Sequence, residues 1–403
     1  MLKNFYEQMR KSSEDEFQRR PRAWLMYTIQ LTSTLLKAFQ EDAKVVWTTY
    51  YSFPMELLAA FDVVPFDFEI ASNLLPGVDP AGCVDIMTKA EAKGYSLDVC
   101  SFHRLALGSY FLGYLPKADL LLTTSHFCDG KTKTNQILAQ YYGKEAIMLD
   151  VPNEISKDSV AYVSKQLKGI AGKLEEVSGH KLDSERLKEC IRASNRARAA
   201  YGRLGELGKR KPFPWDGSRL CILSIIGNMF SGTPFQEQLY LKIIEECEQR
   251  VAEGKVAPEE FRVLWLAWFP AQRTNINEIL RRHNASIVMG ELARVYWDEV
   301  DEEHPFEGMA LRCLKNPYVG PIEQRLDGIR QLLDEYAIDG VIHFSSTACR
   351  HANASFRLIK DVVAKRDIPF LVLDGDMSDE RSYPVEKTRF LLESFIELMA
   401  ARK

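Results

Sequence analysis

Short apolar runs alternate with longer amphipathic stretches over most of the chain. The apolar runs are rich in Val, Ile, Leu and aromatic residues and cover residues 44–49, 63–66, 119–124, 146–150, 262–268, 285–289, 340–344 and 369–373. Strands that are apolar throughout and separated by helical segments indicate parallel sheets that helices cover on both faces. The pattern therefore predicts an α/β fold with two Rossmann-like lobes, whose parallel sheets are flanked by helices.

Amphipathic segments lie before and between the two groups of apolar runs. Residues 23–43 carry apolar side chains at helical spacing, and residues 156–206 are long, charged and helical in pattern. Residues 209–217 contain two prolines and a glycine, which break helices, so we place a domain transition there. No internal repeat is visible in the residues. We expect an N-terminal helical segment at 1–43, a first α/β lobe at 44–180, a helical linker region at 181–258 and a second α/β lobe at 259–403.

Basic and acidic residues are nearly equal in number, which argues against some classes of binding partner. The 403 residues include 52 Lys and Arg against 56 Asp and Glu, so the formal net charge is −4. Nucleic-acid-binding proteins usually carry a basic excess, and no apolar run approaches the roughly 18 residues that a membrane span needs. The charged start lacks the apolar segment of a signal peptide. We expect a cytoplasmic protein that binds neither nucleic acid nor membrane.

Eight cysteines are spread along the chain, at positions 83, 100, 128, 190, 221, 247, 313 and 349. This spacing differs from a dense secreted disulfide framework and fits a reducing compartment. No CxxC pair occurs, so the closely spaced thiolates of zinc ribbons and thioredoxin-like motifs are missing. A metal held by cysteine would take its ligands from loops that are distant in sequence.

Three cysteines precede predicted helices. Cys128 lies between the apolar run 119–124 and a helical segment, and Cys349 follows the run 340–344 in the same way. Open α/β sheets bind ligands at this end of their strands. Cys100 also lies just before a helical segment. The helix dipole favours a thiolate at such places, although an inert buried thiol is the alternative for each.

The other cysteines have weaker claims to chemistry. Cys190, Cys221, Cys247 and Cys313 lie in helical or strongly apolar stretches, which is typical of packing. Cys83 either begins a helix or faces the same ligand-binding cleft as Cys100, at the ends of the parallel strands.

Residues 130–132, Gly-Lys-Thr, follow a strand and precede a helix, as in a phosphate-binding P-loop. That motif needs a glycine five residues before Gly130, where Ser125 stands. We expect an ordinary helix start, with Asp129 as its cap.

Four segments carry a resemblance to a known family. They are GYSLDVCSFHR at 94–104, HFCDGK at 126–131, DGVIHFSSTACR at 339–350 and LDGDMSDERSYPVEKTRFLLESFIELM at 373–399. In this order they resemble the 2-hydroxyacyl-CoA dehydratase and benzoyl-CoA reductase subunit family. The resemblance implies two α/β lobes that jointly hold one 4Fe-4S cluster through Cys100, Cys128 and Cys349, with one iron site open to a small ligand.

The resemblance also implies partners. They are an acyl-CoA substrate, a related second subunit in a heterodimer, and a separate ATP-dependent iron-sulfur activator that delivers one electron. The electron forms a ketyl radical on the thioester carbonyl, which acidifies the β-proton and lets the hydroxyl leave. The expected function is that of the 4Fe-4S, substrate-bearing subunit of an (R)-2-hydroxyacyl-CoA dehydratase, with a subunit of an ATP-dependent benzoyl-CoA reductase as the alternative.

Residues 47–69 resemble the start of the substrate-bearing subunit. By that resemblance Glu69 is the candidate acid or base near the acyl carbons, because burial tunes a carboxyl toward neutral pKa; a solvated strand end is the alternative. The family pattern has a serine ahead of the Phe-Pro turn; in a gapless alignment that serine falls on Tyr51 of this chain, and Ser52 follows one residue later. This departure leaves room for the reductase branch.

Histidines near the cysteines are further candidates. His126 and His343 are expected to line the cleft and to donate hydrogen bonds to cluster sulfurs or to the thioester oxygen. His103 and Arg104 follow Cys100 and either share that part or meet CoA phosphates. A structural role is the alternative for the histidines.

Three other functions stay open. A non-catalytic electron-relay subunit would leave substrate binding to its partner. A double-cubane-cluster reductase would need extra thiolates, for which Cys83 and Cys313 are the candidates. An α/β binding protein with inert cleft cysteines is the interpretation that sets the resemblance aside.

Overall fold

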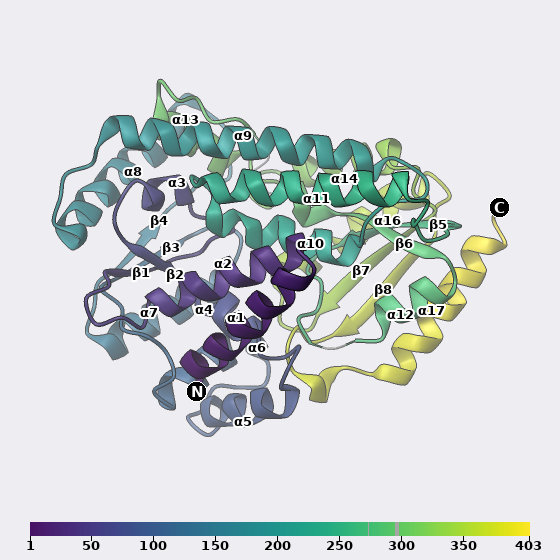
Figure 1. Cartoon of the computed structure of the whole chain (residues 1–403), viewed down its shortest axis with the longest axis horizontal. Helices are drawn as coiled ribbons and strands as arrows, with labels where there is room; N and C mark the ends of the chain where they lie inside the picture. Colours follow the sequence, from purple (N-terminus) through teal and green to yellow (C-terminus); the bar gives the residue numbers. More distant parts are fainter. Residues whose placement is uncertain (273, 295–297) are drawn as a thin grey trace.

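Two four-stranded parallel sheets form the framework of the protein (Figure 1). The computed structural model describes residues 1–272, 274–294 and 298–403, without the side chains of residues 73, 224–226 and 294. The predicted α/β fold with two Rossmann-like lobes is confirmed. The strands are β1 (Val45–Trp47), β2 (Val64–Phe66), β3 (Leu120–Thr124), β4 (Ala146–Leu149), β5 (Phe261–Leu266), β6 (Ala285–Gly290), β7 (Gly340–Ser346) and β8 (Phe370–Gly375).

The two sheets repeat one topology. Their strand orders are β2-β1-β3-β4 and β6-β5-β7-β8, and every pair of neighbours is parallel. Cys128 follows β3 and Cys349 follows β7, so these cysteines occupy equivalent places in the two lobes. The repeat lies in the topology and not in residue identities.

Helices cover the sheets and join the lobes, and α9 runs along one side of the molecule past both (Figure 1). No helix in the described residues is long and apolar enough to cross a membrane. The helices up to the linker are α1 (Leu2–Arg19), α2 (Ala23–Lys37), α3 (Met55–Ala59), α4 (Phe68–Asn73), α5 (Pro80–Glu91), α6 (Ser101–Phe111), α7 (Asp129–Tyr142), α8 (Lys157–Ser178), α9 (Ser184–Gly208), α10 (Gly217–Ile226), η1 (Gly227–Phe230) and α11 (Pro234–Ala252). Those of the second lobe are α12 (Ile276–Arg282), η2 (Glu291–Arg294), α13 (Pro305–Leu314), α14 (Ile322–Glu335), α15 (Arg350–Asn353), α16 (Phe356–Ala364), η3 (Glu380–Ser382) and α17 (Val385–Ala400).

Helix α8 illustrates how the local sequence sets these elements. Ser156 caps the helix, because its hydroxyl accepts the backbone N–H of Ser159 at 3.1 Å. Val163 and Leu167 lie one turn apart on the buried face. The helix ends where Gly179 adopts φ +83°, a left-handed conformation that favours glycine.

Some boundaries differ from the prediction. The charged start forms α1, which packs on α2 and buries Leu2 and Tyr6. The helix expected over 23–43 ends at Lys37. Strand β4 lies at a sheet edge and leaves Ala146 and Met148 exposed, so the expected coverage of both faces is wrong for this strand. The division into four segments stays a prediction.

The larger apolar core spans both lobes. One cluster contains residues of both lobes and of the helices between them, including Leu122, Leu204 and Val341. A second cluster, around Trp265 and Phe344, fills the rest of the second lobe. The two lobes therefore meet over packed side chains around the cavity described next.

Candidate metal and substrate site

A cavity of about 290 Å³ lies where the carboxyl ends of the two sheets meet. Its volume is close to the lower end of the roughly 300–1,000 Å³ usual for small-molecule sites. All three cysteines that the sequence singled out line it. The first lobe contributes, among others, Tyr51, Glu69, Cys100, His103, Phe127 and Cys128, and the second contributes Trp268, Ser346, Cys349, Arg350, His351 and Met377.

Each of the three cysteines is the N-cap residue of a helix. Cys100 precedes α6, Cys128 precedes α7 and Cys349 precedes α15. The Cys128 sulfur accepts the backbone N–H of Lys131 at 3.4 Å, from an extended backbone conformation. The expectation that Asp129 caps α7 is therefore wrong: Asp129 is the first helical residue.

Burial decides the charge of these thiols. It raises the pKa of Cys128 to about 12, and it raises the pKa values of Cys100 and Cys349 as well. The expected thiolates do not form in the protein alone, because the loss of hydration outweighs the helix dipole. A bound cation would reverse this balance, since metal ions stabilise the thiolate form of their ligands.

Lys131 lies at the centre of a buried ion cluster. Its Nζ is 2.6 Å from Asp67 Oδ2 and 2.9 Å from Glu69 Oε2, and it lies 4.6 Å from the centre of the Tyr51 ring. Asp67 also caps α4 by accepting the backbone N–H of Glu69. Because Lys131 is bound to carboxylates, it is not available to a phosphate.

Glu69 is buried in the first turn of α4 at 3% exposure, so the alternative of a solvated strand end is wrong. The His103 ring lies between Glu69 and Cys128. Its Nδ1 is 4.0 Å from Glu69 Oε1, and its Nε2 is 3.8 Å from the Cys128 sulfur. Burial lowers the pKa of His103 to about 3, so the ring is neutral and carries one N–H. A proton on Nδ1 of His103 would point toward Glu69, and a proton on Nε2 would point toward Cys128.

An aromatic wall closes one side of the cavity. Tyr51 contacts Phe127 and Trp268, with ring centroids 4.7 and 5.3 Å apart, and Phe127 contacts Tyr318 at 4.8 Å. Phe127 has φ +73°, a left-handed conformation that costs a non-glycine residue on the order of 1–2 kcal/mol. The ring contacts offset this cost and fix the loop that leads into Cys128.

Tyr51 and Ser52 differ in where they lie. Ser52 is fully buried, and its hydroxyl accepts a hydrogen bond from Thr124 Oγ1 at 2.7 Å. Tyr51 lines the cavity, whereas Ser52 is not part of the wall that the structure describes. Burial raises the pKa of Tyr51 well above its usual value, so the phenol keeps its proton at neutral pH.

His126, His343 and Arg104 lie outside the described cavity wall. His126 is buried beside it, and His343 lies inside β7 with Nε2 3.3 Å from Asn353 Oδ1. Burial lowers the pKa of His126 to about 3. Arg104 is 1% exposed and binds the carboxylates of other residues, so it cannot meet CoA phosphates.

The other five cysteines are buried and do not line the cavity in the described structure. Cys83 lies inside α5 and Cys313 inside α13, and burial raises the pKa of each to about 12. Neither is positioned to extend the set of three cavity thiols.

Sequence reasoning did not select Lys131, Asp67 or Trp268 as site residues. A signal existed for the first two, because two carboxylates follow the strand at 63–66 and the lysine follows the strand at 119–124, at one edge of a parallel sheet. Trp268 carried no such signal, since its place depends on how the lobes dock.

The donor set suits a thiophilic metal centre. Cysteine thiolates are the ligands of iron-sulfur clusters and of zinc, and three thiols from both lobes line one space. Glu69, His103 and Cys128 also offer one ligand atom each, all within 4.8 Å of one another. His103 faces these two neighbours through opposite ring nitrogens, so the three side chains form a row with His103 in the middle and do not converge on a single ion.

Comparison with known proteins decides the family. The sequence model of the family described as "2-hydroxyglutaryl-CoA dehydratase, D-component" matches residues 50–399. The chain belongs to this family. The match covers most of both lobes and includes every residue named above in the cavity wall.

Relatives of this chain are named as parts of two kinds of enzyme. The (R)-phenyllactyl-CoA dehydratase alpha subunit of Clostridium sporogenes is 23% identical over 385 residues, which cover 91% of this chain and 92% of that protein. A benzoyl-CoA reductase subunit of Thauera aromatica is 26% identical over 344 residues, which cover 78% and 79%. The (R)-2-hydroxyisocaproyl-CoA dehydratase alpha subunit of Clostridioides difficile is 23% identical over 392 residues, which cover 91% and 93%. The expectation of an enzyme component is confirmed.

Proposed function

We propose that the chain is the substrate-bearing, 4Fe-4S subunit of an (R)-2-hydroxyacyl-CoA dehydratase. One observation carries the proposal: Cys100, Cys128 and Cys349, from both lobes, line a single cavity together with Glu69. Support also comes from two relatives named as dehydratase alpha subunits, each aligned over 91% of this chain.

The proposed cluster would be held by the three cavity cysteines. Bound there, it would supply a low-potential electron and a Lewis-acidic iron with an open position. The thiols of this cavity must lose their protons on metal binding, because burial keeps them neutral otherwise. The wall of Tyr51, Phe127 and Trp268 keeps water from the reacting groups.

Glu69 is the proposed acid and base of the dehydration. Lys131 holds Oε2 at 2.9 Å, so the carboxylate has a fixed orientation and a counter-charge. Oε1 is 4.0 Å from His103 and accepts no hydrogen bond in the described structure, which leaves it to take the proton from the β-carbon of the acyl group and to pass it to the departing hydroxyl.

Reduction of an aromatic acyl-CoA is the second candidate, and Tyr51 favours it. A phenol stands where the family pattern has a serine, and it joins a wall of aromatic rings that would stack on an aromatic acyl group. The relative from Thauera aromatica is named as part of a benzoyl-CoA reductase.

The proposal includes two protein partners. The relatives are named as subunits, which supports a second, related subunit for this chain. ATP-dependent electron delivery is assigned to a separate iron-sulfur activator, because Lys131, the lysine of the one P-loop-like segment noted in the sequence, is bound to Asp67 and Glu69.

Electron paramagnetic resonance of the anaerobically reconstituted, reduced protein tests the function. We expect (R)-2-hydroxyacyl-CoA thioesters to perturb the cluster signal, because they would reach the open iron position. Perturbation by benzoyl-CoA alone would favour the second candidate. A signal that responds to neither thioester would contradict both.

A further inference from the structure

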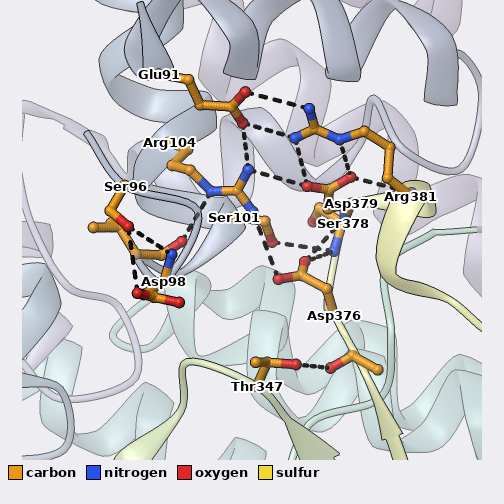
Figure 2. A network of polar contacts seen from close by, with 12 residues as sticks. Glu91, Ser96, Asp98, Ser101, Arg104, Thr347, Asp376, Ser378, Asp379 and Arg381 are labelled. Carbon is orange, nitrogen blue, oxygen red and sulfur yellow. Dashed lines mark hydrogen bonds and ion pairs between the residues drawn. The ribbon is translucent and has the colours of Figure 1, made fainter. Parts of the chain in front are cut away.

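A polar network joins the two lobes at the start of α6, the helix that follows Cys100 (Figure 2). Arg104 of α6 donates from Nη1 to Glu91 Oε1 at 2.6 Å and to Asp379 Oδ2 at 3.0 Å. Arg381 spans the same two carboxylates, with Nη2 at 2.7 and 2.6 Å. The Arg104 side chain is 2% exposed, against 36% for Arg381, so Arg104 is the buried centre of the network.

The network reaches the residues on either side of Cys100. Arg104 Nε donates to the backbone carbonyl of Val99 at 2.9 Å. On the other side, the backbone N–H of Ser378 donates to Ser101 Oγ at 3.2 Å. Both chain neighbours of Cys100 are thus tied, directly or through Arg104, to the second-lobe segment 375–379 (Figure 2).

The same segment is tied to the loop that carries Cys349. The backbone N–H and the hydroxyl of Thr347 both donate to the carbonyl of Gly375, at 3.1 and 3.3 Å. Asp376 fixes the shape of the segment by accepting two of its backbone N–H groups at 2.9 and 3.0 Å. Segment 375–379 therefore contacts the surroundings of two of the three cavity cysteines, one from each lobe.

Cys100 has less local support than the other two cysteines. Cys128 and Cys349 follow central strands, whose ladders fix where the next loop begins. Cys100 follows a mostly exposed loop at 92–99. The position of Cys100 depends instead on how α6 packs, against α4 and α5 in its own lobe and against the second lobe.

We propose that the second lobe positions Cys100: segment 375–379, acting through Arg104 and Ser101, holds the start of α6 in register with the loop of Cys349. Arg104, Ser101 and Asp379 are then positioning residues, and none of them lines the described cavity wall. The inference that this arrangement serves metal binding rests on the proposed 4Fe-4S cluster. The arrangement itself can be measured without metal.

Alkylation of the cluster-free, full-length protein tests this placement. In Arg104→Met, we expect iodoacetamide to modify Cys100 roughly fivefold faster or more, read by peptide mass spectrometry, because the start of α6 opens locally. Cys128 is the internal reference and should change little. The matched control is Arg312→Met, which breaks another buried contact between the lobes, the two hydrogen bonds to Glu56 at 2.7 and 2.6 Å. It should leave the ratio of Cys100 to Cys128 modification near the wild-type value.

Two outcomes would overturn the proposal: an unchanged Cys100 rate in Arg104→Met, or an equal rise at Cys100 and Cys128. If Arg104→Met does not fold, Ser101→Ala and Asp379→Asn each remove a smaller part of the same network. Each should raise the ratio of Cys100 to Cys128 modification in the same direction by a smaller factor.

Iron release separates this inference from the proposed function. In reconstituted protein, Arg104→Met should lose iron to a chelator several-fold faster than wild type and than Arg312→Met. Wild type that takes up no iron would end the cluster proposal, while the alkylation ratio would still decide whether the second lobe positions Cys100. Equal release from wild type and both variants would contradict a positioning role toward the metal.

Discussion

Each lobe has a buried carboxylate just after its second strand, and the two have different surroundings. Glu69 follows β2 and pairs with Lys131, whereas Glu291 follows β6 and pairs with Arg325. All four side chains are at most 4% exposed. Burial and pairing alone would not tell the two sites apart.

Glu291 has its acceptor capacity filled. Arg325 donates Nε to Oε1 at 2.5 Å and Nη2 to Oε2 at 3.0 Å, and the Tyr318 hydroxyl and the Ala267 N–H add bonds at 2.9 and 3.3 Å. Burial by itself would raise the pKa of Glu291, but the charge and hydrogen bonds of Arg325 lower it overall. Because protein groups use its acceptor positions, we assign the Glu291–Arg325 pair a structural role.

Glu69 is only partly satisfied. Within the described part of the chain, its carboxylate accepts one hydrogen bond, from Lys131, and the second oxygen lies beside the cavity. The comparison teaches that a buried ion pair does not mark a functional carboxylate. Spare acceptor capacity beside a cavity is what separates Glu69, the proposed acid and base, from Glu291.

Glu69→Gln is expected to have the largest effect on activity. Glutamine keeps the shape and can still accept from Lys131, but it cannot take up a proton. Turnover with the partner subunit and activator should fall by roughly 10²–10⁴-fold, while the urea midpoint of unfolding changes little. The matched Glu291→Gln should keep turnover per folded molecule. Full turnover in Glu69→Gln would favour the electron-relay alternative.

Arg325→Met should destabilise the fold most. It leaves Glu291 buried without its counter-charge, which costs roughly 3–5 kcal/mol in the free energy of unfolding. Urea denaturation of the cluster-free protein measures this, with the exposed Arg357→Met as the control. A loss of unfolding free energy below about 1 kcal/mol, the range of a surface pair, would show that the Arg325–Glu291 pair does not have the structural role assigned to it.

Lys131→Met should change the charge state of the Glu69 site. Burial and the Glu69 charge already raise the pKa of Asp67, and without the lysine no counter-charge opposes them. The acidic limb of the pH dependence of turnover should move upward by roughly 1–3 pH units. Lys144→Met, at an exposed lysine, should leave the acidic limb where it is. An unchanged limb in Lys131→Met would show that Lys131 does not set the charge state of this site.

His126→Gln should give the smallest effect, a change in the pH dependence of stability. Burial holds the pKa of His126 at about 3 in the fold, whereas an unfolded histidine has a pKa of about 6.5. Below about 6.5 the unfolded chain binds a proton that the fold does not, so stability is present above that pH and is lost toward pH 3. The slope is at most about 1.4 kcal/mol per pH unit and should fall by that amount in His126→Gln. Urea titrations that give wild type and His126→Gln the same slope of unfolding free energy against pH would contradict this prediction.

Most of the framework could be predicted from the sequence because buried parallel strands are apolar on both faces. Runs such as 119–124 and 340–344 stand out from the helices around them, and β3 and β7 lie there. The rule that ligands bind beyond the carboxyl ends of such strands then pointed to Cys128 and Cys349.

The rest of the site depends on long-range contacts. His343 is near Cys349 in sequence, but it lies inside β7, where its ring stacks on Phe356 and Phe370 away from the cavity. The Asp379 partner of Arg104 comes from the far end of the chain, and no local sequence pattern predicts this contact. Likewise, the thiolates expected from the helix dipole are overruled by burial, which only the packed structure shows.

Anaerobic quantitation of iron and acid-labile sulfide, in wild type and in single cysteine variants, tests the central claim most directly. The account predicts about four irons per chain in wild type, loss of that iron in Cys100→Ala, Cys128→Ala and Cys349→Ala, and retention in Cys190→Ala, Cys221→Ala and Cys247→Ala. Folded wild-type protein without iron, or iron retained in the three cavity variants, would contradict it.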